Sequence, residues 1–541
     1  MATKYVVILG SLMSGLGKGV LTASILRILD LYGYSALPIK FDGYLNFDCG
    51  TMNPYQHGEV FVLDDSSEVD MDFGIYERFL GRSLTGDLSI TGGKLFGSII
   101  SKERQGKYLG ETVQIIPHLT DQIIRNIENI AKAKKPDVFV VEVGGTVGDI
   151  ENSYFIEAMR QLSLSHEVVF INLTYLPTLD VVGEQKTKPA QIGLRLLLQD
   201  GIRPNFIICR TASKLLDSTK EKLALFANLD KERIIDDQDQ ATLYNLPLHF
   251  IATGFDRLLL SDLGLNVKRL DRRKSSEWKE NVRKTVSPKG EVNIALVGKY
   301  THLRDSYASV KEAIVHAASI NDVRANISWI ESSDFEKKGC DYSALSRSDA
   351  IIVTGGFGNR GTEGMINIIR HARENHVPYL GLCLGMQLMA VEYARNVAGL
   401  QGANSTEFDK EARHRIIVLL DSQKRITQKG GTMRLGAQEC VLLERSSIAY
   451  KSYGTGMISE RHRHRYEFNN RYATTLKKCG LKITGVTKDR KLVEFIEWST
   501  GFGIGTQSHP ELKSRFGRPA PLFASLIAAA KENHVRKDLN R

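Results

Sequence analysis

A cysteine in a short glycine-flanked turn is well placed for covalent chemistry. The segment GLCLG at 381–385 follows an apolar run over 377–380 and precedes a helical pattern over 386–396. This order matches the GxSxG nucleophile elbow, with Cys383 in place of serine. The glycines permit a tight turn that exposes the sulfur at a helix N-terminus, where its thiolate is favoured. The segment therefore predicts a cysteine nucleophile.

A histidine and a glutamate further along the chain complete this chemistry. A cysteine nucleophile needs a base, and the base needs a group that orients it. His509-Pro510-Glu511 contains both, and an extended backbone places the two side chains on the same side. The N–H of Leu384 and the glycines of 355–358 are candidate oxyanion donors. Each piece alone fits a buried cysteine or a loop histidine, but together they predict a triad.

A second group of residues is suited to phosphate binding. An apolar strand over 4–10 runs into SLMSGLGKG at 11–19, and a helical stretch over 20–31 follows. Glycines let backbone N–H groups approach an anion, the helix N-terminus favours negative charge, and Lys18 neutralises phosphate oxygens. The standard motif GxxxxGK[ST] has a magnesium-binding Ser or Thr where Gly19 stands. A metal must therefore be held elsewhere.

Two carboxylates are candidates for holding that metal. Asp72 lies in VDMDFG, and Glu142 ends an apolar strand. A carboxylate at the C-terminal end of a central strand lies beside the phosphate site of an α/β sheet, and Mg²⁺ takes one or two carboxylates plus phosphate oxygens. Each residue alone also fits an ordinary loop or cap position. Lysines over 186–191 and Lys222 suit a polyphosphate, although their spacing alone equally fits a solvated surface.

The elements that position these residues form an α/β pattern repeated in two halves. Apolar runs such as 137–145, 204–210 and 349–356 alternate with helical patterns. Continuous Val/Ile-rich strands followed by helices predict parallel sheets buried on both faces. The polar, basic stretch 271–290 separates the halves. We expect an α/β fold with domains at 1–268 and 291–541 and a linker at 269–290.

Composition narrows the class of protein further. The 541 residues are 42% hydrophobic and 25% charged, which excludes a disordered, collagen-like or small disulfide-rich chain. No apolar run approaches the ~18–20 residues that span a bilayer. The six scattered cysteines form no CxxC pair, which predicts free thiols and a cytoplasmic location. The net charge of +10 fits phosphorylated ligands as well as nucleic acid, and no nucleic-acid motif or membrane segment is evident.

The motifs of the second half resemble the class I glutamine amidotransferases. They are GGFGNRG at 355–361, GLCLGMQ at 381–387 and SHPEL at 508–512. That family usually has aromatic residues around its His-Pro-Glu, so Ser508 and Leu512 depart from the pattern. The resemblance implies a flavodoxin-like glutaminase domain with Cys383 as nucleophile, His509 as base and Glu511 as its orienter.

The whole chain resembles the CTP synthase family. The matching segments include GSLMSGLGKG at 10–19, GTMNPYQHGEVFV at 50–62, VEVGGTVGDIE at 141–151, KTKPAQ at 186–191 and ERHRHRYE at 460–467. The family usually has prolines where Gly43 and Cys49 stand, so we expect a looser backbone there. The resemblance implies a P-loop-like, dethiobiotin-synthetase-like synthetase domain. It also implies amination of UTP through a 4-phosphorylated intermediate, GTP activation, CTP inhibition and a homotetramer.

The resemblance also assigns roles to individual residues. ATP contacts are implied at Gly15, Leu16, Gly17, Lys18, Gly19, Val20, Asp72, Arg210 and Gln240. UTP or CTP contacts are implied at Ser14, Asp149, Ile150, Glu151, Lys186, Thr187, Lys188, Pro189, Ala190, Gln191 and Lys222. Glutamine contacts are implied at Gly356, Leu384, Gly385, Met386, Gln387, Glu407 and Arg465. Asp72 and Glu142 are implied as Mg²⁺ ligands, and Arg434 lies in a segment linked to GTP activation.

Two other functions remain open at this point. A GMP-synthetase-like ligase is disfavoured because its usual SGGxDS-type loop is missing. A regulatory nucleotide-binding protein with a degenerate glutaminase is disfavoured because Cys383, His509 and Glu511 are all present.

Overall fold

The chain forms two compact units, each described separately below. The structure is a computed structural model that describes residues 3–179, 184–337, 339–420, 423 and 430–539. Unit 1 comprises residues 1–48, 75–82 and 87–282, and unit 2 comprises residues 49–74, 83–86 and 283–541. The sequence boundary at 268 would place residues 49–74 in the first domain, whereas they pack within unit 2. Long-range ion pairs, described below, hold them there.

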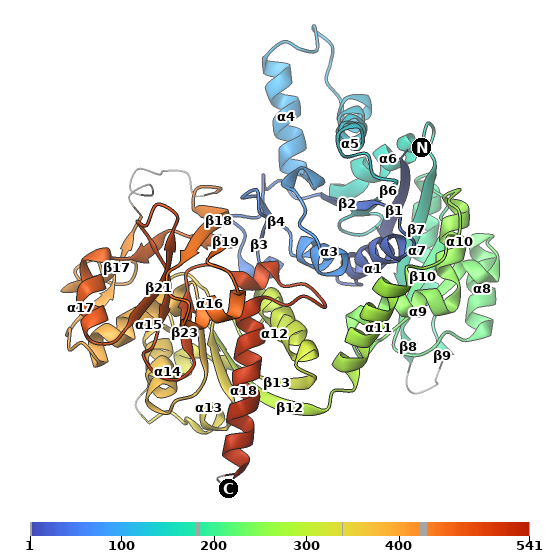
Figure 1. Ribbon diagram of the computed structural model, residues 1–541. Coiled ribbons are helices and arrows are strands. Elements are labelled where there is room, and N and C mark those ends of the chain that lie inside the picture. Colours follow the sequence, from blue (N-terminus) through green and yellow to red (C-terminus); the bar gives the residue numbers. More distant parts are fainter. Residues whose placement is uncertain (1–2, 180–183, 338, 421–422, 424–429, 540–541) are drawn as a thin grey trace. The chain divides into compact units, whose positions relative to one another are not determined.

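Unit 1 is built on a parallel sheet of seven strands in the order β11-β10-β7-β1-β6-β2-β5 (Figure 1). The side chains of β1 are nearly all buried, as expected for a strand covered by helices on both faces. The strands are β1 (Lys4–Gly10), β2 (Ala36–Asp42), β5 (Ser89–Thr91), β6 (Val138–Val143), β7 (Val168–Tyr175), β10 (Phe206–Thr211) and β11 (Ile234–Gln238). The parallel α/β prediction for this half is confirmed.

The helices of unit 1 connect these strands and cover the sheet. They are α1 (Lys18–Leu31), α4 (Gly92–Arg104), α5 (Thr120–Lys134), α6 (Ser153–Leu162), α7 (Lys188–Gln199), α8 (Asp217–Ala227), α9 (Leu246–Thr253) and α10 (Phe255–Asp262). Helix α3 (Asp72–Leu80) crosses from unit 2 into unit 1, and α11 (Arg272–Val286) crosses back. The linker expected at 269–290 is therefore mostly helix. Trp278 anchors α11 in unit 1, because its side chain is buried and its Nε1 donates to Tyr244 O at 2.8 Å.

Unit 2 contains a nine-stranded mixed sheet in the order β13-β12-β14-β15-β23-β22-β21-β18-β19. The first five strands are parallel, and the pairs from β23–β22 to β18–β19 are antiparallel. The parallel strands are β12 (Gly290–Gly298), β13 (Val323–Glu331), β14 (Ala350–Val353), β15 (Tyr379–Leu382) and β23 (Gly503–Thr506). The others are β18 (Arg434–Leu442), β19 (Met457–His464), β21 (Lys482–Thr487) and β22 (Val493–Glu497). The α/β class is confirmed, and the parallel sheet expected here is extended by an antiparallel half.

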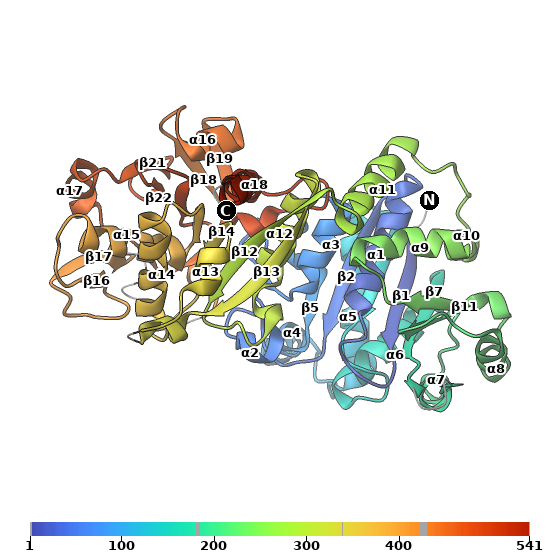
Figure 2. The ribbon, with the colours of Figure 1, turned by 90° about the horizontal axis from the view of Figure 1, so that it is seen from below.

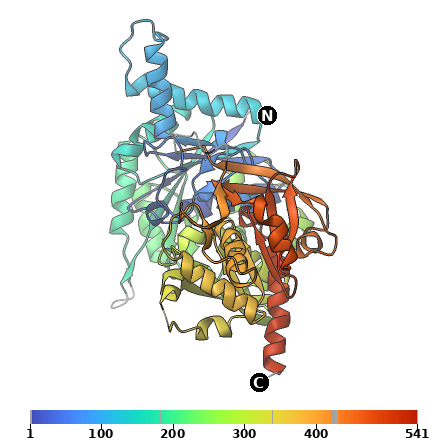
Figure 3. The same cartoon turned by 90° about the vertical axis from the view of Figure 1, so that its left-hand side faces the viewer.

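Alternate residues of the parallel strands face two different hydrophobic clusters. Ala295 and Val297 of β12 pack with helices α14 (Thr362–Glu374) and α15 (Leu384–Asn396). Ile294 and Leu296 pack with α12 (Ala308–Ile320) and α18 (Pro521–Leu539). Figure 2 shows β12 and β13 side by side, and Figure 3 shows α18 as the long helix near the C-terminus. Helices therefore cover both faces, as the period-2 burial requires.

Smaller elements complete unit 2. A hairpin of β3 (Phe61–Val62) and β4 (Glu68–Val69) follows the short helix α2 (Pro54–His57). The remaining helices and strands are α13 (Ser343–Arg347), β16 (Ala403–Ser405), β17 (His414–Leu419), α16 (Ile448–Tyr453), β20 (Tyr466–Phe468) and α17 (Ala473–Lys478). Among the described residues, no helix combines the length and the apolar character needed to cross a bilayer. All six cysteines are free thiols.

Candidate functional site

The predicted nucleophile lies in a strained turn between β15 and α15. Cys383 has φ 49° and ψ −99°, which non-glycine residues rarely adopt. Its backbone N–H donates to Thr506 O of β23 at 2.8 Å, so the turn is tied to the neighbouring strand. The strain is typical of a nucleophile elbow, where it presents the side chain above the sheet.

The glycines of the elbow are required by close backbone approaches. A Cβ on Gly385 would lie 2.2 Å from Val353 O, and one on Gly381 would lie 2.7 Å from the carbonyl carbon of Gly385. The hydroxyl of Tyr379 donates to Gly385 O at 2.9 Å. Any larger residue would push the turn away from the sheet, so these glycines determine where the sulfur lies.

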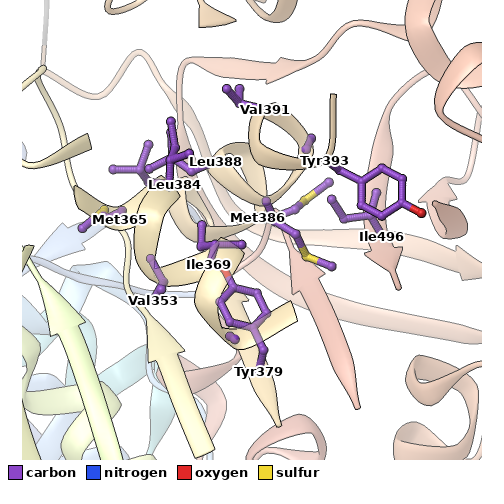
Figure 4. Close-up of a cluster of buried hydrophobic side chains, with 14 of the residues drawn as sticks. Val353, Met365, Ile369, Tyr379, Leu384, Met386, Leu388, Val391, Tyr393 and Ile496 are labelled. Atoms are coloured by element: carbon purple, nitrogen blue, oxygen red, sulfur yellow. The ribbon is translucent and has the colours of Figure 1, made fainter. Parts of the chain in front are cut away.

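The helix behind the elbow is anchored in the core of unit 2. Figure 4 shows Met386, Leu388 and Val391 of α15 among side chains from β14, α14, β15 and β22. Met386 and Leu388 are buried. Because close-packed interiors transmit displacements rather than absorb them, this packing holds Cys383 at a defined position.

The predicted base and its orienter meet the nucleophile in the folded chain. His509 Nδ1 lies 2.7 Å from Glu511 Oε1, and the charge of Cys383 acts on the imidazole. A Cβ on Gly355 would lie 3.0 Å from His509 Cε1 and 3.7 Å from Cys383 Cβ. The structure therefore brings together a Cys-His-Glu arrangement, with the first glycine of 355–358 against it.

Electrostatics favour the charged form of His509. Burial of the imidazole alone would lower its pKa, but the charges of Glu511 and Cys383, together with their hydrogen bonds, raise the pKa to about 10. A histidine that holds its proton at neutral pH can deliver it to a departing amine. A cavity beside the triad is lined by Pro54, Val60, Tyr300, Phe357 and Arg463, among others, and offers room for a small amide substrate.

The raised pKa predicts an alkaline limit on amide hydrolysis. We expect kcat/KM for glutamine to fall as the pH rises through about 10, because His509 then loses the proton that the leaving ammonia needs. Glu511→Gln removes the strongest charge that raises this pKa. The fall should then move to lower pH, by about one unit or more. The measurement is the pH profile of ammonia release from glutamine.

The exposed Glu439, paired with Lys488 at 2.8 Å, supplies the matched control. Glu439→Gln should leave the profile unchanged. A Glu511→Gln profile that superimposes on that of the unmodified enzyme would contradict the role of Glu511.

The residues expected to contact glutamine differ in where the structure places them. Gly356 lines the cavity, and a Cβ there would lie 3.7 Å from Leu384 Cδ2. Glu407 is largely buried, which raises its pKa, and accepts from the Gly358 N–H at 3.0 Å. Arg465 donates to Gln423 Oε1 at 2.6 Å.

Three of these residues, Gln387, Met386 and Gly385, make their contacts away from the cavity lining. Gln387 donates to Tyr466 O at 2.9 Å and to Gln507 Oε1 at 3.1 Å. The side chain of Met386 is buried in the core, and Gly385 in the first turn of α15 is buried as well. Their contacts with glutamine stay predictions, and for Met386 only the backbone is available.

Sequence reasoning missed a buried lysine near the site. Lys299, at the end of β12, is 1% exposed, and its ammonium donates to Gly358 O. Burial lowers its pKa to about 8 despite the nearby Glu407. The only signal in the sequence is a lysine directly after the glycine that ends an apolar strand. That signal does not distinguish a buried cation from a surface one.

Ser508 and Leu512, which depart from the amidotransferase pattern, are both buried beside the triad. Ser508 Oγ lies 2.6 Å from Thr506 Oγ1, and Leu512 is 5% exposed. The serine therefore satisfies its hydroxyl locally and the leucine packs as an apolar residue.

In unit 1, the phosphate loop joins β1 to α1 as predicted. Gly15 and Gly17 have φ values of 75° and 95°, which explains the glycines at these positions. Lys18 folds back, so that a Cβ on Gly10 would lie 2.9 Å from its Nζ, and it donates to Gly145 O. The ammonium is thus held at the C-terminal edge of the sheet, where ligands of open α/β sheets bind.

A cavity brings together residues expected to bind ATP from distant parts of unit 1. Gly15, Leu16, Gly17 and Val20 line it together with Arg210 and Gln240. Sequence reasoning missed three further lining residues, which are Asp237, Leu243 and Leu246. Burial raises the pKa of Asp237 to about 6, although Arg210 lies 3.2 Å away and opposes the shift. A slot that combines apolar side chains such as Leu243 and Leu246 with the polar groups of Arg210, Asp237 and Gln240 next to a phosphate loop suits a purine base.

Glu142 lies in a setting that fits a metal ligand next to phosphates. It is 1% exposed on β6 and accepts from Thr22 Oγ1 at 2.9 Å and from Lys40 Nζ at 3.0 Å, and the Tyr76 hydroxyl also donates to it. Since Thr22 belongs to the first turns of α1, the carboxylate adjoins the helix that follows the phosphate loop. Hard carboxylate oxygens at this place suit Mg²⁺.

Asp72, the other expected metal ligand, starts α3 and belongs to unit 2. Among the described residues, no cluster of three or more His, Cys, Asp or Glu side chains is assembled for a metal. That finding is compatible with Mg²⁺, which uses few carboxylates. The pairing of Asp72 with Glu142 stays a prediction.

The residues expected to contact UTP or CTP lie on loops and on the start of α7. Asp149 Oδ2 accepts from the Thr146 N–H at 2.9 Å, and Lys186 pairs with Glu184 at 2.6 Å. Lys222 lies close enough to act electrostatically on the same Glu184. Helix α7 begins within the KTKPAQ segment, so Lys188, Pro189 and Gln191 surround a helix N-terminus while Ala190 and Thr187 are buried. Exposed lysines at a helix N-terminus favour an anionic ligand.

The CTP synthase family usually has proline where Gly43 stands, and close packing around this position explains the glycine. A Cβ there would lie 2.5 Å from Asn152 Oδ1 and 2.6 Å from Glu151 O. The backbone next to Gly43 is therefore tightly packed rather than loose.

Comparisons with known proteins show the family to which both halves of the chain belong. Residues 4–265 match the family described as CTP synthase N-terminus, and residues 302–529 match glutamine amidotransferase class-I. The CTP synthase of Methanocaldococcus jannaschii is 46% identical over 98% of this chain and 99% of its own length. Those of Carboxydothermus hydrogenoformans and Pyrococcus abyssi are 48% and 47% identical, covering 98% and 99% of this chain and 98% and 99% of their own lengths. With similarity that extends over both units and both sites, the chain belongs to the CTP synthase family.

Proposed function

We propose that the chain aminates UTP to CTP with ammonia released from glutamine, and that the reaction passes through a UTP phosphorylated at O4. The observation that carries this function is the presence, in one chain of this family, of an assembled Cys-His-Glu triad and a phosphate loop with its adjoining cavity. A triad alone would support a glutaminase, and a phosphate loop alone would support many nucleotide enzymes. Together they match a glutamine-dependent ligase.

Glutamine hydrolysis follows from the geometry of unit 2. Cys383 gives its proton to His509 and attacks the side-chain amide carbon of glutamine, and His509 passes that proton to the departing ammonia. Water activated by His509 then hydrolyses the resulting thioester, which releases glutamate and regenerates the thiol. Glu511 keeps the imidazole oriented and charged through its 2.7 Å contact. The N–H of Leu384 and the backbone near Gly355 and Gly356 are placed to stabilise the oxyanion.

Activation of UTP is assigned to unit 1. The C4 oxygen of uracil leaves poorly as hydroxide and readily as phosphate, so transfer of the γ-phosphoryl group of ATP to it makes the ring susceptible to ammonia. Gly15–Val20 and Lys18 hold the phosphates of ATP, while Arg210 and Gln240 face the base. Bound at Asp72 and Glu142, Mg²⁺ would neutralise charge on the transferred phosphoryl group.

The finer features rest on the family resemblance. We infer that the substrate UTP and the product CTP contact Ser14, 149–151, 186–191 and Lys222. We also infer that GTP activates the enzyme, that CTP inhibits it, and that four chains form a homotetramer. The free thiols are consistent with a reducing, cytoplasmic location. Arg434, which pairs with the buried Glu494 at 2.7 Å, joins the segment linked to GTP to the interior of unit 2.

An isotope experiment tests the phosphorylated intermediate. UTP labelled with ¹⁸O at O4 is converted by the full chain with ATP, Mg²⁺ and ammonium. Phosphorylation at O4 predicts that the label leaves in inorganic phosphate as CTP forms, which mass spectrometry of the phosphate measures. Label released into water, or no CTP at all, would overturn the proposal.

A further inference from the structure

Among the described residues, Arg461 is the largest side chain that is fully buried. It lies on β19 and is 0% exposed. Its Nε donates to Asp64 Oδ1 at 2.7 Å, its Nη2 lies 3.3 Å from Ser83 Oγ, and its guanidinium lies 5.3 Å from the ring of Phe61. A buried guanidinium is tolerated only where its charge is compensated, and Asp64 is the acid that compensates it.

The same arginine holds the segment that contains the base and its orienter. The His509 N–H donates to Arg461 O at 2.7 Å, and Arg461 Nη1 donates to Leu512 O at 3.2 Å. One residue thus binds the backbone on both sides of Glu511. The His509–Leu512 backbone is therefore placed by the position of Arg461.

Asp64 comes from a part of the chain 397 residues away. It follows β3 at the tip of the β3–β4 hairpin, which packs against β19 and the start of β18, as Figure 1 shows. The Ala437 N–H donates to Asp64 O at 3.1 Å, and Ser66 Oγ donates to Leu435 O at 3.1 Å. A Cβ on Gly436 would lie 2.5 Å from Ser66 Oγ, so the hairpin tip and this loop are in direct contact.

A second ion pair fixes the other strand of the hairpin. Arg463, which lines the cavity at the triad, donates through Nε to the buried Glu68 at 2.8 Å. Arg461 and Arg463 are two apart on β19, so both point from the same face toward the hairpin. The hairpin is therefore attached at residues adjoining the catalytic segment.

We propose that Asp64 is a positioning residue for glutamine hydrolysis, and that it acts through Arg461 on the backbone that places His509 and Glu511. The proposal rests on the proposed function, because it presumes that the triad hydrolyses glutamine. Asp64 touches neither substrate nor triad. It neutralises and orients the guanidinium that does hold the triad segment.

The charges around this pair determine what should change when Asp64 is lost. Burial would raise the pKa of Asp64, but the hydrogen bond and charge of Arg461 lower it well below its usual range, so the acid is ionised at all working pH values. Without it, Arg461 becomes an uncompensated cation next to His509 and should lower the pKa of the imidazole. Within the described part of the chain, the other titratable or charged groups near Asp64, Arg461 or His509 include Lys513, Glu460, Glu511, Cys383, His462, His464, Arg463 and Arg515, whose Nη1 donates to the same Leu512 O at 2.9 Å.

The test measures glutamine hydrolysis by the full chain carrying Asp64→Asn, which keeps the side-chain volume and removes the charge. We expect kcat to fall by up to about 10²-fold, the scale of a misplaced catalytic group. The alkaline limb of the pH profile should move to lower pH. Glu460, whose pKa is raised to about 7 by burial, titrates outside that limb. CTP synthesis from ammonium should be unchanged.

Asp65→Asn is the matched control. Asp65 lies in the same hairpin tip, where its carboxylate accepts from the Ser67 and Gly86 N–H groups rather than from Arg461. The Asp65→Asn variant should have the kcat of the unmodified enzyme, and the alkaline limb of its pH profile should not move. If Asp64 served stability alone, Asp64→Asn would lower the amount of folded enzyme without moving the limb, and that result overturns the proposal.

A second variant decides the question if Asp64→Asn fails to fold. Arg461→Lys keeps the charge but cannot reach Asp64 and Leu512 O together as the guanidinium fork does. We expect a lower kcat with the alkaline limb unmoved, and a kcat equal to that of the unmodified enzyme overturns the proposal. An unmodified enzyme that releases no ammonia from glutamine would instead refute the proposed function.

Discussion

Replacing Cys383 with alanine is expected to abolish glutamine-dependent CTP synthesis while CTP synthesis from ammonium survives. Removal of a triad nucleophile costs about 10⁶-fold in related hydrolytic chemistry, because the other members cannot replace it. The elbow itself should persist, since alanine removes only the sulfur and the N–H of Cys383 still donates to Thr506 O at 2.8 Å. The measurement compares CTP formation, followed chromatographically, with glutamine and with ammonium as nitrogen source.

The chain offers a control for unspecific effects of losing a thiol. Cys479 is exposed and ends α17, away from the triad. Cys479→Ala should support CTP synthesis from both nitrogen sources at unaltered rates. If Cys383→Ala lost both activities, the assignment of hydrolysis to unit 2 and amination to unit 1 would be refuted.

Both functional turns could be predicted from sequence because their signals are local. Each has an apolar strand, a glycine-containing turn and a helical pattern in direct succession, as at Gly15–Lys18 and Gly381–Gly385. The pairing of His509 with Glu511 is also local, since they are two positions apart in the sequence. Such features depend on backbone conformation over a few residues, which residue type largely determines.

The antiparallel half of the second sheet could not be predicted in the same way. Strand β19, MISERHRH, carries five charged or ionisable residues and has no apolar run. Four of these side chains are buried and Arg463 is partly buried, and Asp64 and Glu68 compensate the charges of Arg461 and Arg463. The partners are nearly 400 residues away in sequence, so no local pattern indicates the strand or the assignment of residues 49–74 to unit 2. The burial of Lys299 could not be predicted either, because its contact with Gly358 O joins residues that are distant in the sequence.

Lys18→Met is expected to stop CTP synthesis from glutamine and from ammonium to the same extent, by about 10³-fold. Methionine keeps the aliphatic stem that packs on Gly10, where a Cβ would lie 3.0 Å from Lys18 Cδ, and removes only the charge. That charge directly follows the loop residue Gly17, which lines the cavity together with Gly15. Without it, the negative charge that develops on the transferred phosphoryl group has lost a fixed partner.

Glutamine hydrolysis measured without nucleotides should be unaffected by Lys18→Met, since the triad belongs to unit 2 and Lys18 to unit 1. Lys132→Met, at an exposed position of α5, is the matched control and should leave all three activities unchanged. Equal losses with both nitrogen sources would place the defect in phosphoryl transfer, which precedes the use of ammonia. A loss confined to glutamine would contradict that order, because a residue that acts on UTP activation must affect every nitrogen donor alike.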